Sequence, residues 1–138
     1  MGIPFGAPIP FVEHLGFELT RFDGGFSEIV YIPRPEHLNS FDVVHGGATM
    51  TLLDVTMATA ARSITPDMGV VTIEMKTTFM RASRGRLRGV GRLVHRTRSL
   101  AFTEASIFDA DGQLCSQASG TFKYVARRSN SAPAVSTD

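Results

Sequence analysis

The segment from Gly46 to Ser63 constrains the fold more than any other part of the chain. Of its eighteen residues only Asp54 and Arg62 carry a formal charge, and none is proline. Alanine, methionine and leucine, which favour helices, recur throughout, and Pro66 follows soon after the segment ends. Because the apolar residues cover most of the circumference of a helix, the sequence predicts one long helix that other elements enclose on several sides.

Strands are predicted both before and after this helix. Asp23-Gly24-Gly25 is a hairpin signal, since glycine adopts the positive φ of tight turns. A loop without a clear period, 33–44, leads into the helix, and after Gly69 apolar and polar residues alternate as in half-solvated antiparallel strands. The predicted strands are 16–22, 26–32, 70–80, 86–98, 100–110 and 113–125.

This order of two strands, one buried helix and four strands indicates an α+β fold. An antiparallel sheet of five to six strands wrapped around one long central helix accounts for it. Strict alternation in the strand at 70–80 would place one set of side chains on one face and a second set on the other. The two sets are Val71, Ile73, Met75, Thr77 and Phe79, and Thr72, Glu74, Lys76 and Thr78.

The length of 138 residues suits a single domain. Residues 1–10, with three prolines, form an extended lead-in, and the folded body spans 11–126, beginning with one helical turn at 11–15. Residues 127–138 are small, polar and interrupted by proline, which predicts a disordered tail.

Composition limits the partners. A formal net charge of +1 gives no general attraction to nucleic acid or to anionic membranes. The single cysteine, Cys115, excludes an intramolecular disulfide framework, and the four histidines are too scattered to form a metal ligand set. With neither a signal-peptide pattern nor a membrane span in the sequence, we expect a cytoplasmic protein that binds neither nucleic acid nor membrane.

Asp54 is the unusual residue of the helix. Desolvating an unpaired carboxylate costs several kcal/mol, so a carboxylate on an apolar helix should have a partner or a chemical task. One interpretation is an ion pair with Arg62 or with an arginine of a strand. The other is catalysis.

The helix start offers a complementary group. The first backbone N–H groups of a helix have no intrahelical partner, and Gly46 and Gly47 would let a ligand oxygen approach them closely. Such donors can hold the oxyanion that develops when a carbonyl is attacked. Asn39 and His45 flank this point with hydrogen-bonding side chains. Alternatively, the two glycines only permit tight packing and His45 caps the helix.

Helix geometry separates these two groups. Asp54 lies eight residues after Gly46 and therefore about 12 Å farther along the same helix. It cannot reach a carbonyl held at its own helix start. If both groups act on one atom, the second comes from another copy of the chain, with two antiparallel helices related by a two-fold axis. The hypothesis therefore requires a homodimer with shared sites.

These residues resemble the active-site segment of hotdog-fold acyl-CoA thioesterases of the phenylacetate-pathway (PaaI-like) type. The likeness spans about residues 11–125 and is carried by four stretches. They are "RPEHLNSFDVVHGG", "LLD" on the helix, "TTFMRASRG" and "LAFTEASIFDADGQLCSQASGTF". In this fold two subunits usually join their sheets edge to edge, and pairs often assemble into tetramers, so the resemblance implies a homodimer and a dimer of dimers.

The resemblance also implies roles for individual residues. Asp54 matches the nucleophile or general base, and Gly46, together with Gly47, matches the backbone donor to the thioester carbonyl. Asn39 and His45 match residues that position the thioester or the attacking water. Thr72 matches a Ser or Thr that holds this water, although threonine is also ordinary in a strand. No cofactor is implied beyond the coenzyme A of the substrate.

Substrate contacts follow from chemistry. The phosphates of coenzyme A favour arginine, and we expect Arg81 and Arg84, at a strand end, to bind them, while Arg86, Arg88, Arg92 and Arg96 share one parity and form the solvated face of a strand. Met50, Met57, Phe79 and Met80 could line an aryl or medium-chain acyl pocket or belong to the core.

Three functions remain at this stage. The first is an acyl-CoA thioesterase, the second a non-catalytic acyl-CoA binding or sensing domain, and the third a hydratase or dehydratase of the same fold. Asp54 argues against the non-catalytic domain. The arrangement from Asn39 to Gly47 matches the thioesterases better than the hydratases and dehydratases.

Overall fold

The computed structural model describes residues 2–127. Its helices are α1 (Pro10–Leu15), the 3-10 turn η1 (Pro35–His37) and α2 (Gly46–Arg62). Its strands are β1 (Glu18–Asp23), β2 (Phe26–Tyr31), β3 (Met68–Phe79), β4 (Leu87–Arg96), β5 (Leu100–Phe108) and β6 (Leu114–Ala126). The strands form one sheet in the order β1-β2-β4-β5-β6-β3, and every neighbouring pair is antiparallel.

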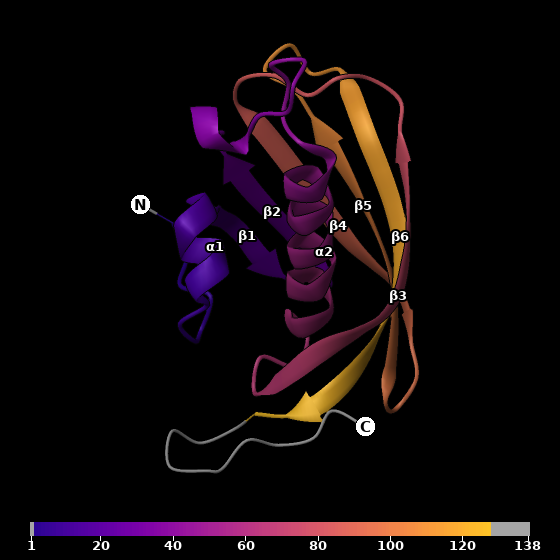
Figure 1. Cartoon of the computed structure of the whole chain (residues 1–138). Helices are drawn as coiled ribbons and strands as arrows, with labels where there is room; N and C mark the ends of the chain where they lie inside the picture. The colour runs from indigo at the N-terminus through magenta and orange to yellow at the C-terminus, as the bar shows by residue number, and fades with distance from the viewer. Residues whose placement is uncertain (1, 128–138) are drawn as a thin grey trace.

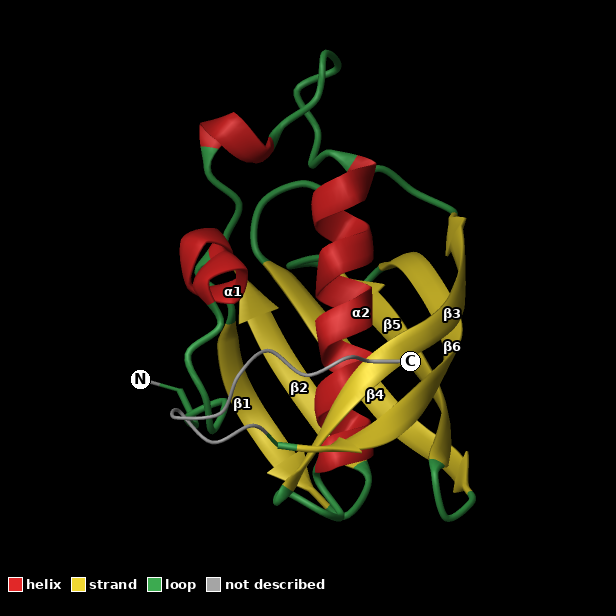
Figure 2. Cartoon of the chain, turned by 60° about the horizontal axis from the view of Figure 1, so that its bottom comes forward, coloured by secondary structure: helices red, strands yellow, loops and turns green. Residues whose placement is uncertain are grey.

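The sheet curves around α2, and α1 lies beside β1 (Figures 1 and 2). This arrangement confirms the predicted α+β class and the six strands around one long helix. The predicted helical turn at 11–15 and the hairpin at Gly24 and Gly25, both at positive φ, are also present. Of the predicted tail at 127–138, all but Arg127 lies outside the described residues, and the division into lead-in, body and tail stays a prediction.

Helix α2 forms the centre of the core. Leu52, Leu53 and Met57 are fully buried against the concave face of the sheet, whose own buried residues include Leu87 and Phe122. Burial of these side chains supplies most of the stabilisation of such a helix, since a helix of this length gains little from propensity alone.

Two glycines of β4 let the helix approach the sheet. A Cβ atom at Gly91 would lie 2.6 Å from both the Ser27 Oγ and the Thr56 carbonyl oxygen. One at Gly89 would lie 2.7 Å from the Thr56 hydroxyl. In this contact the Ser27 hydroxyl donates to the Thr56 carbonyl at 2.6 Å, and the Thr56 hydroxyl donates to the Leu52 carbonyl at 2.6 Å. The close contact therefore leaves these buried polar groups paired.

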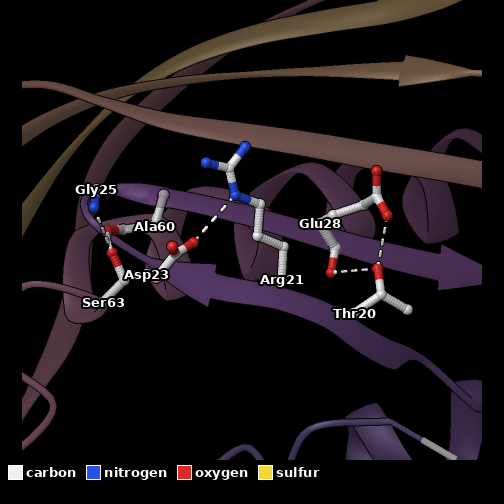
Figure 3. A network of polar contacts seen from close by, with 7 residues as sticks. All are labelled: Thr20, Arg21, Asp23, Gly25, Glu28, Ala60 and Ser63. Carbon is white, nitrogen blue, oxygen red and sulfur yellow. Dashed lines mark hydrogen bonds and ion pairs between the residues drawn. The ribbon is translucent and has the colours of Figure 1, made fainter.

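The C-terminal end of α2 is fixed to the first hairpin. The Gly25 N–H donates to the Ser63 hydroxyl at 2.8 Å, and this hydroxyl donates to the Ala60 carbonyl at 2.7 Å (Figure 3). Across the hairpin, the Thr20 hydroxyl donates to the Glu28 carboxylate at 2.7 Å. Polar contacts thus hold the helix at the end opposite to Gly46.

A β-bulge in β3 changes the predicted faces. Thr72 pairs with Phe122, whereas Glu74 pairs with Thr121, so Ile73 is an extra residue in the strand. Because directly paired residues share a face and Phe122 is buried, Thr72 points toward α2. The strict alternation expected from the sequence is therefore wrong for Val71, Thr72 and Ile73.

Candidate active site

The N-terminus of α2 presents one backbone donor without a partner. The His45 Nδ1 accepts the Gly47 N–H at 2.8 Å, and the His45 carbonyl accepts the N–H groups of Ala48 and Thr49. His45 is thus the N-cap of the helix, as one interpretation of the sequence proposed. Among the described residues, the Gly46 N–H donates no hydrogen bond, which leaves it available to a ligand.

A groove of about 370 Å³ lies beside this donor. The Phe79 ring forms one wall, and its Cζ would be 3.5 Å from a Cβ atom at Gly46, so a larger residue at position 46 would narrow the approach to the N–H. Lining residues are Asn39, Val43, Val44, Gly46, Thr49, Phe79, Met80, Arg81, Ala82 and Ser83. The structure therefore brings together five of the residues predicted from the sequence: Asn39, Gly46, Phe79, Met80 and Arg81.

Asn39 shapes the loop that borders the groove. Its Oδ1 accepts the Phe41 N–H at 2.9 Å and the Val43 N–H at 3.3 Å, and its own N–H donates to the Val43 carbonyl at 2.8 Å. Within residues 2–127 the side-chain amide N–H groups of Asn39 have no partner, so they can donate to a ligand in the groove.

Asp54 lies two turns farther along α2 and does not line the groove. The Thr72 hydroxyl donates to its Oδ1 at 2.6 Å, a contact that the bulge at Ile73 permits. Burial raises the pKa of the Asp54 carboxyl, and the Thr72 hydrogen bond acts in the opposite direction. The carboxylate is half-buried and poised to accept a proton more readily than an exposed one.

The structure contradicts the ion-pair interpretation of Asp54. Arg62 donates to three backbone carbonyl oxygens, those of Met68, Phe5 and Pro66. Among the described residues no basic side chain forms an ion pair with Asp54. The charge of Asp54 is therefore not neutralised within the described part of one chain.

The predicted arginines divide into two groups. Arg88 pairs with Glu28 at 3.2 Å and Arg92 with Glu104 at 3.1 Å on the outer face of the sheet, which confirms the solvated face for these two. The assignment is wrong for Arg96, because a bulge between Leu93 and His95 places it opposite the buried Ala101. Its guanidinium instead covers the ring of Tyr124.

Arg81 and Arg84 remain free of carboxylates. Both are exposed and, within the described residues, neither forms an ion pair. Together with Asp109 and Asp111 they line a second depression, of about 260 Å³, and Arg81 also lines the groove at Gly46. The two depressions thus adjoin at Arg81 and Ala82, and the exposed guanidinium groups lie beside the groove.

The four apolar residues that the sequence offered for an acyl pocket differ in their exposure. Met57 is fully buried in the core, whereas Met50, Phe79 and Met80 are 39%, 52% and 49% exposed. Sequence reasoning missed Thr49 of α2 as a groove residue, and it also missed Val43, Val44, Ala82 and Ser83. These last four come from two loops joined by a hydrogen bond from the Val44 N–H to the Ser83 carbonyl, a contact that no sequence period reveals.

This fold is that of a hotdog protein, and its long helix begins beside a groove with a backbone N–H that has no partner within residues 2–127. A profile of the Thioesterase superfamily matches residues 41–116. The proofreading thioesterase EntH of Cronobacter turicensis is 34% identical over 107 residues, which cover 75% of this chain and 77% of EntH. The chain therefore belongs to the thioesterase superfamily, and the predicted class of enzyme, a thioester hydrolase, is confirmed.

Solved structures agree with this assignment. The conserved protein PA5202 of Pseudomonas aeruginosa superposes with a TM-score of 0.82 at 30% identity, over 87% of this chain and 97% of that one. The PaaI protein from the phenylacetic acid degradation operon of E. coli superposes with a TM-score of 0.80 at 18% identity, over 86% of each chain, and so shares the fold. No helix within residues 2–127 is long and apolar enough to cross a membrane.

The raised pKa of Asp54 makes a prediction about stability. The folded protein binds this proton more tightly than the unfolded chain, so the stabilisation is fully present below the unfolded pKa and is lost as the pH rises through the folded pKa. At neutral pH the ionised carboxylate therefore opposes folding. Asp54→Asn, which keeps an oxygen for the Thr72 hydroxyl, should unfold at a higher urea concentration than the wild type.

Urea unfolding at several pH values checks this. The difference in the urea midpoint of unfolding between Asp54→Asn and the wild type should become smaller as the pH falls toward about 4, where an ordinary aspartate begins to protonate. Asp67→Asn, at an exposed position after α2, is the control and should show no such narrowing. A variant at position 54 that is less stable than the wild type at neutral pH would contradict the prediction.

Proposed function

We propose that the protein hydrolyses an acyl-CoA thioester to the free acid and coenzyme A. The observation that carries this proposal is the unpaired N–H of Gly46, which opens onto a groove at the start of α2. A thioester carbonyl seated there would accept this hydrogen bond, and the bond would strengthen as the carbonyl oxygen becomes an oxyanion. The helix dipole adds partial positive charge at the same point.

The attack requires a second group, and Asp54 supports that role. Its carboxylate is half-buried, carries no neutralising cation among the described residues, and receives the Thr72 hydroxyl. Asp54 would act as general base toward water, or as nucleophile with water resolving the acyl-enzyme. In the first route the Thr72 oxygen accepts a hydrogen bond from that water. In both, the carbonyl carbon gains an oxygen and the C–S bond breaks, releasing coenzyme A as a thiol.

Asn39 and His45 would complete the site. Asn39 lines the groove, and its side-chain N–H groups, which have no partner within residues 2–127, would donate to the thioester or to the water. His45 holds the Gly47 N–H through Nδ1, which places its proton on Nε2. The Gly47 N–H serves this helix cap, so Gly47 would contribute to the substrate site only by allowing close approach. The proposed reaction uses no metal and no cofactor apart from the coenzyme A of the substrate.

The acyl group would be aryl or medium-chain. Phe79 and Met80 border the groove and would present apolar surface to the substrate end beyond the carbonyl, whereas Met50, one turn from Gly46 on α2, does not line the groove of a single chain. The name of one structural relative supports an aryl group, since that PaaI protein comes from a phenylacetic acid degradation operon.

Thiol release from a panel of aryl- and fatty-acyl-CoA esters tests the reaction. Asp54→Asn should lower kcat by about a thousandfold or more, because it removes the base or nucleophile. Asp67→Asn should behave like the wild type. If no ester in the panel releases thiol while a non-hydrolysable acyl-CoA analogue still binds, the protein is a binding domain. Formation or loss of an enoyl chromophore instead of thiol release would indicate a hydratase.

The shared site requires a homodimer. Gly46 and Asp54 lie about 12 Å apart on one helix, so the groove of one protomer would receive Asp54 of the partner subunit. Gly46, Met50 and Asp54 are spaced by four residues and lie on one side of α2, where Met50 leaves 39% of its surface exposed. Met50 is midway between the other two, so an antiparallel pair of helices would bring the two copies of Met50 together on the two-fold axis.

Cysteine cross-linking tests this axis. Met50→Cys should form a disulfide-linked dimer under mild oxidation, because facing positions on packed helices fall within disulfide reach. Ile64→Cys, at a similarly exposed position beyond the other end of the helix, should not cross-link. The native Cys115 is fully buried and should not interfere. An active protein that stays monomeric in sedimentation, or links through position 64 instead, would overturn the shared site. Sedimentation also tests the dimer of dimers that we propose.

Arg81 and Arg84 would bind the phosphates of coenzyme A. Arg81→Gln and Arg84→Gln should each raise KM about three- to tenfold with little change in kcat, as expected for exposed charge-assisted contacts to a part of the substrate that does not react. Arg98→Gln, another exposed arginine, should leave KM unchanged. The increase in KM should be absent with a short pantetheine thioester, which has no nucleotide phosphates, and its persistence there would contradict phosphate binding.

A further inference from the structure

A buried tyrosine and a buried histidine lie directly behind the loop that borders the groove. Tyr31 ends β2 and is fully buried, with its ring edge packed on Phe17 at a centroid distance of 5.0 Å. His37 ends the turn η1 and is 7% exposed. The Tyr31 Oη lies 2.7 Å from the His37 Nδ1, so the buried core contacts the loop through this pair.

The hydrogen bonds fix the protonation of the histidine. The backbone N–H of Arg34 donates to the same Nδ1 at 3.1 Å, so this nitrogen is an acceptor and the ring proton is on Nε2. The Tyr31 hydroxyl must therefore donate, and burial raises its pKa to about 12, which keeps the proton in place. Burial, with a smaller contribution from the Arg34 charge, lowers the pKa of His37 and favours the neutral ring.

His37 transmits this anchoring to the site through its backbone. Its carbonyl accepts the N–H of His45, the N-cap of α2, at 2.9 Å. Between these two residues, Leu38 and Val44 form an isolated antiparallel β-bridge, and the Asn39 N–H donates to the Val43 carbonyl. Segment 37–45 is thus a closed loop, with Asn39 near its tip and the start of α2 at its base. A shift of the His37 ring would displace both.

We propose that Tyr31 and His37 are positioning residues for the thioesterase site. They touch no reacting atom, and they set the location of Asn39 and of the helix start that carries the Gly46 N–H. This inference rests on the proposed function for its kinetic consequence, whereas the anchoring itself is a property of the loop. Small displacements of groups that contact the reacting carbonyl lower kcat strongly, so the pair matters more for rate than for substrate affinity.

The chain offers a matched control. Its other tyrosine, Tyr124, is also buried, and its hydroxyl donates to the Ala61 carbonyl at 2.7 Å, at the opposite end of α2. Tyr31→Phe and Tyr124→Phe each remove one buried hydroxyl and should have similar costs in stability. Only the first should affect the site.

The experiment compares four variants in the thiol-release assay and in amide hydrogen exchange. Tyr31→Phe should lower kcat about tenfold with KM changed less than about twofold, and His37→Leu should lower kcat about a hundredfold. His37→Asn, whose amide oxygen can accept the same two hydrogen bonds, should recover to within about threefold of the wild type. Tyr124→Phe should keep the wild-type kcat.

Exchange of the His45 amide supplies a readout that does not depend on catalysis. It should become about ten times faster in Tyr31→Phe and stay unchanged in Tyr124→Phe, while the amides of β4 to β6 keep their protection. Equal losses of kcat in both tyrosine variants, or wild-type kcat in His37→Leu, would overturn the proposal. If the wild type hydrolyses no thioester, the proposed function fails, and the His45 exchange alone decides whether the pair anchors the loop.

Discussion

The contact between α2 and β4 is the constraint on which the rest of the structure depends. The helix lies so close to the strand that positions 89 and 91 have no room for a side chain. Ser27 and Thr56 use the same closeness to pair their polar groups, so the contact is both tight and fully hydrogen-bonded. With its middle held in this way, α2 has little freedom to slide or rotate. The positions of Gly46 at one end and Asp54 halfway along are consequences of that contact.

Electrostatics explain why the two chemical groups are kept apart within one chain. A carboxylate next to the Gly46 N–H would compete with a substrate carbonyl for the same donor and for the positive end of the helix dipole. At Asp54 the carboxylate instead meets a hydroxyl, and burial disfavours its charge. In the proposed dimer, the substrate carbonyl at one helix start and the carboxylate of the second subunit would come together only when both the substrate and the second subunit are present.

Much of the fold could be predicted from the sequence because the helix and strands have strong, different periods. Asp54, Gly46, Asn39 and Phe79 were also accessible, since a carboxylate in an apolar helix and a glycine pair at its start are local signals. Thr72 was assigned a role only by resemblance, and strict alternation would have turned it away from Asp54. The bulges at Ile73 and near Val94, like the loop contact between Val44 and Ser83, depend on pairing between distant segments. His37 gave no signal, because its partner Tyr31 belongs to another element.

The extra residue in β3 also affects how this chain should be compared with its relatives. An alignment anchored at the helix motif meets no extra residue of the bulge before it reaches Thr72. An alignment anchored at the strand end, Phe79, has to cross the extra residue Ile73 before it reaches Thr72. In a relative whose strand lacks the bulge, alignments anchored at these two ends would disagree by one column. The hydroxyl equivalent to Thr72 would then be assigned to the wrong position in one of them. A one-residue gap at Ile73 resolves the conflict, and the loss or gain of that residue is a change that evolution could make without turning the hydroxyl away from its carboxylate.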